Sequence, residues 1–204
     1  MKLLDGRGGT YEARVQRIGT REAVLDVISF SKAAELPPVD IAIAIIRAPR
    51  FDLAVEKCTE LGVRRLMPFR AERSVRGGAD DGGGLKVDRI RSKIVASCKQ
   101  SGRPYFPVID RIESFESLLE RIPAYAAAFV ADQHSASSCS DAAQAEEGPV
   151  LGIVGPEGGL SGAEMERLVA GGAKPLSLGP FRLRTETAAI CLSYRLMIRG
   201  GGSV

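Results

Sequence analysis

The chain has 204 residues, of which 45% are hydrophobic and 26% charged, so we expect a globular protein with one medium domain, or one domain and a small appendage. Its net charge of +3 identifies no partner, although the positive excess is carried by arginine, whose planar guanidinium suits phosphate recognition. No apolar stretch approaches the length of a membrane span and the N-terminus has no apolar signal-peptide core, so we expect neither membrane insertion nor secretion.

The cysteines and the one histidine do not form a metal-binding pattern. Cys58, Cys98, Cys139 and Cys191 lie about 40 or more residues apart, so there is no CxxC pair, and His134 has no familiar metal-site spacing to them. We therefore expect no metal site. Reduced thiols in a cytoplasmic protein are expected instead, with Cys58, Cys98 and Cys191 on the core faces of helices.

The first 36 residues have the pattern of a small β domain. Residues 10–19 and 21–29 alternate apolar and polar side chains on either side of Gly19 and Thr20, which predicts a hairpin. So short a segment cannot close a barrel, and we expect it to be part of a small sheet. Pro37-Pro38 then predicts a linker.

From residue 41 onward, short apolar runs alternate with amphipathic segments. The run at 41–46 is typical of a buried parallel strand, and residues 51–63 place Phe51, Val55 and Cys58 on one face of a helix. This alternation predicts an α/β fold with a mostly parallel sheet. The last helix is apolar on much of its circumference, which suggests contact with a partner subunit. Further strands are expected at 64–69, 107–109, 127–131, 150–154 and 175–179, and further helices at 88–102, 115–122, 161–172 and 185–198.

The stretch GIVGPEGGLS, at 152–161, is a glycine-rich turn between a strand and a helix. Ser161 and Glu164 match a capping box, so the start of the helix is well specified. The stretch matches neither a phosphate-binding P-loop nor a dinucleotide-binding turn. It is either a turn that needs glycine for positive φ or a loop whose backbone approaches a ligand. Pro156 and Glu157 favour the second interpretation, because a simple chain reversal does not need them.

A second strand–turn–helix loop, LSLGPFRLRTETAAI, occupies 176–190. Thr185 is the expected helix cap, and Glu186 favours the helix dipole. Arg184 is not explained in this way, because a cation beside a helix N-terminus is disfavoured, and an anionic target is expected. The two loops are about 25 residues apart, and we expect them to lie side by side on one sheet edge and to form a pocket.

The segments VEKCTELGV, CKQSGR, IVGPEGGLS and LGPFRLRTETAA, in this order, resemble the 16S ribosomal RNA uracil-N3 methyltransferases of the SPOUT superfamily. The resemblance is strong over about residues 40–198, and LLDGRGGTYEARV resembles the late part of that family's PUA-like barrel. It implies a partial, RNA-binding PUA-like β domain at 1–36 and a SPOUT methyltransferase domain with a C-terminal trefoil knot at 37–204. It also implies a homodimer, with S-adenosyl-L-methionine held in the knot.

The chemistry of methyl transfer to uracil N3 predicts two catalytic residues, and the resemblance implies the cofactor-binding ones. Arg184 is expected to stabilise the charge that develops on the uracil carbonyl oxygens when N3 loses its proton. Glu186 either accepts that proton or positions Arg184. Cofactor-binding residues are expected after the strand at 127–131 and in the two loops: Ala131, Asp132, Gly155, Glu157, Gly158, Gly159, Leu178, Gly179, Leu183 and Thr187, together with Arg184.

Contacts with 16S ribosomal RNA, expected within the small subunit, are assigned to basic residues outside the two loops. The cluster at 64–76 is the densest, Arg47 and Arg50 are further candidates, and His134 is expected to be an ordinary loop residue. The expected RNA-binding residues are Arg64, Arg65, Arg70, Arg73, Arg76, Lys99 and Arg103.

Two departures from the family pattern and two alternative functions accompany this interpretation. Phe181 stands where the family commonly carries arginine, so Arg182 is either a displaced substitute or an unrelated surface residue. The chain also starts where the family's barrel is half built, which implies either a longer natural chain or a reduced RNA platform. The alternative functions are a SPOUT-class methyltransferase with another RNA target and an RNA-binding protein that keeps the fold without catalysis.

Overall fold

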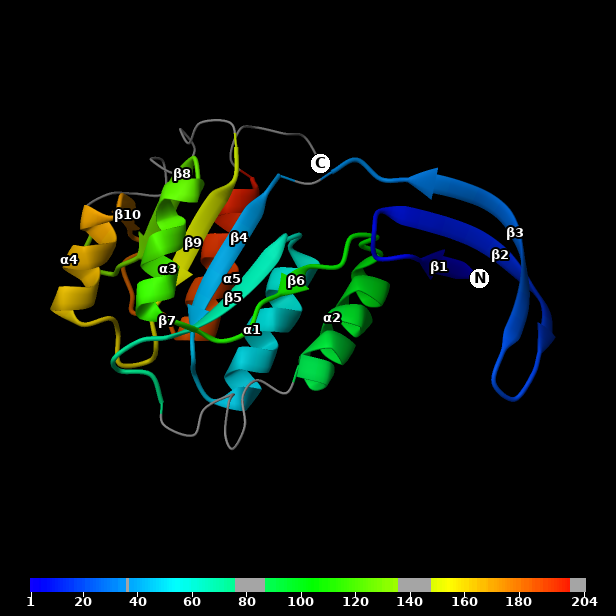
Figure 1. Cartoon of the computed structure of the whole chain (residues 1–204), viewed down its shortest axis with the longest axis horizontal. Helices are drawn as coiled ribbons and strands as arrows, with labels where there is room; N and C mark the ends of the chain where they lie inside the picture. The colour runs from blue at the N-terminus through cyan, green and yellow to red at the C-terminus, as the bar shows by residue number, and fades with distance from the viewer. Residues whose placement is uncertain (36, 76–86, 136–147, 199–204) are drawn as a thin grey trace.

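The computed structural model describes residues 1–35, 37–75, 87–135 and 148–198, and Arg76 and Cys139 lie outside these ranges. The described chain forms a small antiparallel sheet followed by a larger α/β body (Figure 1). The predicted α/β fold is therefore confirmed. The trefoil knot that the resemblance implies stays a prediction.

The small sheet is built from β1 (Lys2–Leu4), β2 (Gly9–Ile18) and β3 (Ala23–Lys32), in that order and with antiparallel pairing throughout. The turn between β2 and β3 is closed by the Gly19 N–H, which donates to the Glu22 carbonyl at 2.8 Å. The predicted hairpin is confirmed.

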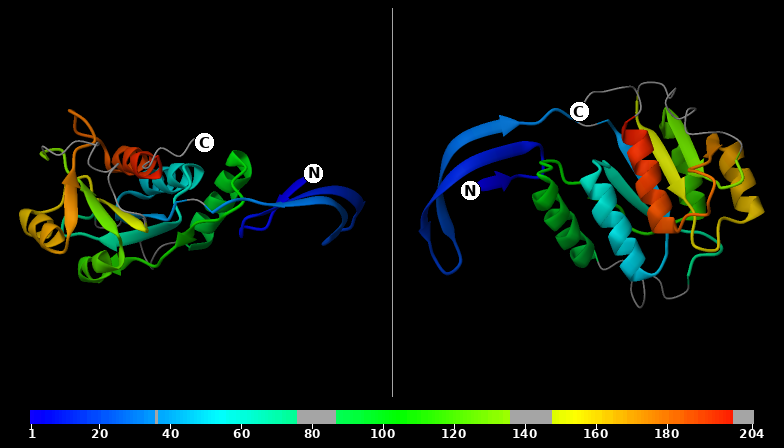
Figure 2. Two further views of the ribbon diagram at one scale, coloured as in Figure 1. Left: turned by 90° about the horizontal axis from the view of Figure 1, so that it is seen from above. Right: turned by 180° about the vertical axis from the view of Figure 1, so that it is seen from behind.

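The small sheet projects from the α/β body, as Figures 1 and 2 show from three sides. Main-chain hydrogen bonds attach it to the segment after α2, from Gly8 to Pro104 and from Phe106 to Gly6, both at 3.0 Å. Within the described chain, much of its apolar surface is uncovered. Six of its apolar side chains are 38–77% exposed: Val15, Ile18, Val24, Val27, Ile28 and Phe30.

The larger sheet has the strand order β10-β8-β9-β4-β5-β6, with β7 also paired to β5, and every pairing is parallel. The last strand is formed by residues 173–176 rather than by the predicted 175–179, so the loop after it begins earlier. The strands are β4 (Val39–Ala44), β5 (Arg65–Arg70), β6 (Val108–Ile109), β7 (Glu113–Ser114), β8 (Ala127–Ala131), β9 (Val150–Val154) and β10 (Ala173–Leu176).

Helices cover both faces of the larger sheet (Figures 1 and 2). One core lies under α1, α2 and α5 and includes Phe51, Ile90 and Leu192, while the other lies under α3 and α4 and includes Phe115 and Leu168. The helices are α1 (Ala48–Glu60), α2 (Val87–Ser101), α3 (Phe115–Arg121), α4 (Gly162–Ala170) and α5 (Thr185–Met197), with a 3-10 turn at Ile122–Ala124.

Two of the predicted core cysteines are fully buried. Cys58 and Cys98 have no exposed surface, and burial raises the pKa of the Cys58 thiol to about 12, although Ser193 donates a hydrogen bond to its sulfur at 3.2 Å. Burial also raises the pKa of Cys98. Cys191, by contrast, is only half-buried, and all three thiols are free. The two buried thiols are therefore apolar packing groups at neutral pH.

The close packing of α5 on β9 depends on Gly152. A Cβ at this position would lie 2.7 Å from Ile41 Cδ1, 2.8 Å from Leu192 Cδ2 and 3.0 Å from Leu196 Cδ1. Much of the apolar surface of α5 is therefore buried within its own chain, at Ala188, Ala189, Leu192 and Leu196.

Replacing Gly152 with valine should destabilise the fold, because the added side chain overpacks the α5–β9 contact. We expect a loss of about 1–3 kcal/mol in the free energy of unfolding, measured by urea denaturation. Gly162→Ala is the matched control, since no atom lies within 4 Å of a Cβ at that position. An unchanged denaturation midpoint for Gly152→Val would contradict the packing described here.

Candidate functional site

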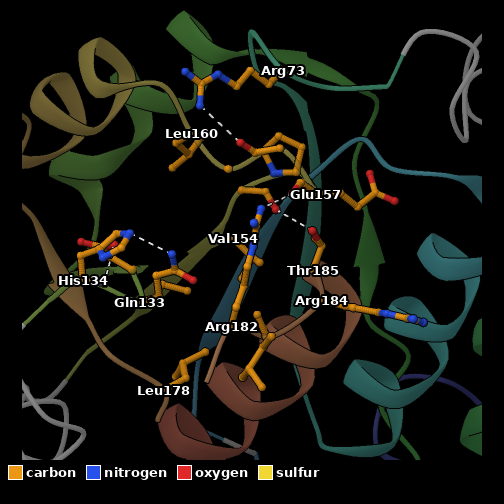
Figure 3. Close-up of a pocket in the computed structure, with 18 of the residues that line it drawn as sticks. Arg73, Gln133, His134, Val154, Glu157, Leu160, Leu178, Arg182, Arg184 and Thr185 are labelled. Carbon is orange, nitrogen blue, oxygen red and sulfur yellow. Dashed lines mark hydrogen bonds between the residues drawn. The ribbon is translucent and has the colours of Figure 1, made fainter. Parts of the chain in front are cut away.

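A cavity of about 460 Å³ opens at the carboxyl edge of the larger sheet. Its walls come from the loops that follow β8, β9 and β10 and from the start of α5, with further side chains from α1 and from the loop after β5 (Figure 3). The sequence prediction that the two strand–turn–helix loops meet in one pocket is consistent with this arrangement. The size is that of a small-molecule site.

Two hydrogen bonds join the loops after β9 and β10. The Thr185 Oγ1 hydroxyl donates to the Gly155 carbonyl at 3.0 Å, and Arg182 Nη2 donates to the Glu157 carbonyl at 2.8 Å. The prediction that Thr185 caps α5 is wrong, because the N-cap position is Arg184, whose side chain makes no capping hydrogen bond. The Thr185 hydroxyl instead ties the start of α5 to the end of β9.

The loop at 155–161 is held by the helix that follows it. The Ser161 hydroxyl accepts from the Glu164 N–H, while Glu164 Oε2 accepts from the Ser161 N–H at 2.9 Å, so the predicted capping box is confirmed. Gly159 has φ +73°, although no atom lies within 4 Å of a Cβ there. Position 159 therefore requires glycine because of its positive φ, and not because neighbouring atoms would crowd a side chain.

The loop after β5 forms a third side of the site. Glu164 Oε1 accepts from the Glu72 N–H at 2.8 Å, so one carboxylate fixes this loop and the start of α4 together. Arg73 Nη1 donates to the Gly158 carbonyl at 3.3 Å, and its side chain lines the cavity. Arg73 therefore belongs to the pocket wall, whereas the sequence predicts only an RNA contact for it.

A group of three charges lies on one side of the cavity. Arg50, from the first turn of α1, donates through Nη1 to Glu157 Oε1 at 3.0 Å, and its Nε lies 3.8 Å from Glu186 Oε1. The side chain of Glu186 is 7% exposed and that of Glu157 25% exposed. Arg50 and Glu157 line the cavity.

Most of the predicted cofactor residues line the cavity, but two of the site residues predicted from the sequence do not. Thr187 is exposed on α5, because the helix turns its side chain away, and Glu186 is buried behind the cavity beside Arg50. Arg184 lines the cavity and is exposed, and in Figure 3 its side chain points away from Gln133 and His134. The lining residues predicted from sequence are Ala131, Asp132, Gly155, Glu157, Gly158, Gly159, Leu178, Gly179, Leu183 and Arg184.

The predicted RNA-binding residues fall into separate places. The prediction for Arg103 is wrong, because its guanidinium is buried and donates to the Thr59 and Val63 carbonyls, both at 2.7 Å. Arg64 and Arg65 lie at the amino edge of the sheet. There, Arg64 donates two hydrogen bonds to the buried carboxylate of Asp40, and Arg65 pairs with Asp110. Lys99 is exposed on α2, and Arg70 is exposed at the carboxyl end of β5.

Several lining residues were not identified from the sequence as part of the pocket. His134, expected to be an ordinary loop residue, lines the cavity with Gln133, and their side-chain Nε2 atoms lie 2.8 Å apart. Their position directly after β8 was the available signal, because the carboxyl ends of parallel strands commonly form sites. The apolar side chains of Val154, Leu160 and Met165 also line the cavity.

Neither a metal site nor a membrane-spanning element is found among the described residues. No group of three or more histidine, cysteine, aspartate or glutamate side chains there is arranged to hold a metal ion. Within the same ranges, none of the helices is both long and apolar enough to cross a membrane.

Comparison with known proteins identifies the family. Residues 34–197 match the RNA methyltransferase domain family. The chain belongs to this RNA methyltransferase family. One relative, ribosomal RNA small subunit methyltransferase E of Mycobacterium bovis, is 35% identical over 190 residues, which cover 90% of this chain and 67% of the relative. The Bacillus subtilis protein of the same name is 33% identical over 179 residues, covering 81% of this chain and 70% of the relative.

Solved structures share the fold of this RNA methyltransferase family member. A putative methyltransferase from Legionella pneumophila, solved with bound S-adenosylmethionine, has a TM-score of 0.83 and 26% identity, covering 96% of this chain and 81% of that one. Ribosomal RNA small subunit methyltransferase E from Neisseria gonorrhoeae has a TM-score of 0.84 and 24% identity, and the match covers 95% of this chain and 80% of that one. The second comparison shows a shared fold.

Removing the Thr185 hydroxyl should loosen the loop after β9. Thr185→Val should lower the free energy of unfolding by about 1 kcal/mol, because one hydrogen bond to the Gly155 carbonyl is lost. Amide hydrogen exchange at 155–160 should become faster. Thr187→Val is the control on the exposed side of the same helix, and equal exchange in the two variants would contradict a role for this hydrogen bond.

Proposed function

We propose that this protein transfers a methyl group from S-adenosyl-L-methionine to N3 of a uridine in 16S ribosomal RNA. Membership of the RNA methyltransferase family and the relatives named small subunit methyltransferase E support methylation of ribosomal RNA with this donor. The choice of uracil N3 rests on the resemblance of the GPEGG and LGPFRLRTETA loops. One structural observation supports the proposal most strongly: hydrogen bonds from Thr185 and Arg182 join these two loops in one pocket.

The pocket is compatible with S-adenosyl-L-methionine. Its volume of about 460 Å³ suits a molecule of this size, and apolar walls at Val154, Leu160 and Leu178 offer contact for an adenine ring. The carboxylate of Asp132 is suited to the positive and hydrogen-donating groups of the donor. When bound, the donor supplies an electrophilic methyl carbon on a sulfonium.

The protein's own contribution is to orient the uracil and to stabilise charge. Loss of the N3 proton places negative charge on the two carbonyl oxygens of the ring, and Arg184 is the proposed donor to them. This arginine is exposed at the N-cap of α5, and it makes no ion pair with any acid in the described parts of the chain. The target base must leave its stack to enter the cavity, which single-stranded or loop RNA allows most readily.

The carboxyl edge of the larger sheet is the proposed surface for RNA near the reaction. Arg73 lines the cavity and Arg47 lies at the start of α1 beside it, while Arg182 and Arg184 extend from the loop after β10. Their positive charge would attract the phosphates on either side of the target base. We assign residues 1–36 to a partial PUA-like RNA-binding domain and residues 37–204 to the methyltransferase domain. The proposed place of action is the cytoplasm.

The test of the function is mass spectrometry of 16S ribosomal RNA from a strain that lacks this gene. One N3-methyluridine should disappear and should return when the gene is restored. A parallel calorimetric titration with S-adenosyl-L-methionine should show binding. An unchanged methylation pattern, or no detectable binding at millimolar donor, would overturn the proposal.

Replacing Arg184 with alanine should slow methylation of small ribosomal subunits by about 10²-fold or more, the range typical of losing a preorganised donor. The dissociation constant of S-adenosyl-L-methionine should change little, because the side chain is proposed to act on the base. Assembled subunits purified from the deletion strain are the substrate, and single-turnover rates are the measurement. Near-normal rates would remove Arg184 from the catalytic residues.

A homodimer is the proposed assembly, with α5 at the contact. Tyr194 and Ile198 on the outer side of this helix are 51% and 42% exposed, next to the half-buried Ile190. Light scattering at micromolar concentration should give twice the chain mass of 21.7 kDa. Tyr194→Arg should shift the mass toward one chain, and a monomer for the unmodified protein would contradict the proposal.

A further inference from the structure

Glu157, Arg50 and Glu186 form a row of alternating charges contributed by three separate elements. Arg50 comes from α1, Glu157 from the loop after β9 and Glu186 from the first turn of α5. Arg50 contacts one oxygen of each carboxylate, at 3.0 Å for Glu157 and 3.8 Å for Glu186. The three side chains carry a formal charge of −1 when both acids are ionised, so one further proton would neutralise the group.

The second oxygen of each carboxylate has no hydrogen-bond partner among the described residues. Both Glu157 Oε2 and Glu186 Oε2 are buried and unpaired. Buried carboxylate oxygens are costly to leave unpaired, and a donor is therefore expected from outside the described chain. The two acids differ in access, because Glu157 lines the cavity and Glu186 lies behind it.

The position of Arg50 is not explained by the stability of its own helix. It lies in the first turn of α1, where the helix dipole disfavours a cation and where no acidic residue is present. Its planar fork reaches both acids at once, which a lysine ammonium does less well. The main chain of Glu157 is also held, since Arg182 donates to its carbonyl.

From these contacts we infer that Glu157 is the group that accepts the N3 proton of the target uracil, and that Arg50 positions it. Glu186 anchors Arg50 from behind and does not contact the substrate. This inference rests on the proposed function. The Glu157 side chain, 25% exposed at the cavity, turns so that Oε2, which is buried in this structure, faces the base and accepts the N3–H proton. The N3 electron pair forms the bond to the methyl carbon, and the carbon–sulfur electron pair stays on sulfur. The products are N3-methyluridine, the neutral thioether and a protonated Glu157.

Single-turnover methylation of small subunits lacking the methyl group tests the assignment. Glu157→Gln should lower the rate by about 10²-fold or more, the range for removal of a general base, while the dissociation constant of S-adenosyl-L-methionine changes by less than about 3-fold. Arg50→Ala should lower the rate without a matching rise in the KM for subunits, and Arg50→Lys should recover part of the loss. Glu166→Gln, an exposed acid on α4, is the matched control with an unchanged rate.

The double variant separates positioning from an independent role. If Arg50 acts through Glu157, Arg50→Ala combined with Glu157→Gln should be no slower than Glu157→Gln alone. If the rate losses of the two single variants instead multiply in the double variant, the positioning role of Arg50 is overturned. A more than 10-fold loss of donor affinity in Glu157→Gln would make Glu157 a donor ligand and overturn its role as base.

The remaining outcomes distinguish this inference from the proposed function. A normal rate in Glu157→Gln, with an active unmodified protein, overturns the assignment of the base and leaves the function standing. An unmodified protein that binds the donor but does not methylate the subunits overturns both.

Discussion

The contact between α5 and β9 is the constraint on which the site depends. Gly152 lets Leu192 and Leu196 approach the strand, and α5 runs antiparallel to it, so that the first residue of the helix arrives where the strand ends. Thr185 can then donate to Gly155. Strands β9 and β10 are not neighbours in the sheet, since β8 lies between them. The helix, rather than strand pairing, therefore brings the loop after β10 onto the loop after β9.

Charge is used differently at the two edges of the larger sheet. At the amino edge, Asp40 is 1% exposed and receives hydrogen bonds from Arg64 and from the Tyr125 hydroxyl. Burial, together with this carboxylate, holds the pKa of Tyr125 well above its usual range. Such a pairing offsets the cost of burying the carboxylate. At the carboxyl edge, by contrast, Arg73 and Arg182 bind main-chain carbonyls of the GPEGG loop and line the cavity.

The helices α1, α4 and α5 begin at the carboxyl edge and contribute to the cavity wall, and their starts do not follow the same local rules. The start of α4 has its capping box, and Glu164 also orders the neighbouring loop. The starts of α1 and α5 instead carry Arg47, Arg50 and Arg184, each at a local cost of a few tenths of a kcal/mol up to about 1. Unfavourable local choices concentrated around one cavity are expected where function, rather than stability, selects the residue.

The sequence by itself determined the order of strands and helices, the capping box at Ser161 and the two loops that carry the pocket, because these follow from hydrophobic period and local chemistry. It could not separate the arginines between 64 and 73, because β5 carries Arg65 and Arg70 to opposite edges of the sheet. Nor could it show that Arg103 is buried against main-chain carbonyls, or that Arg50 lies between Glu157 and Glu186. Those partners are 40 to 136 positions apart in the chain, and only the packing of helices on the sheet brings them together.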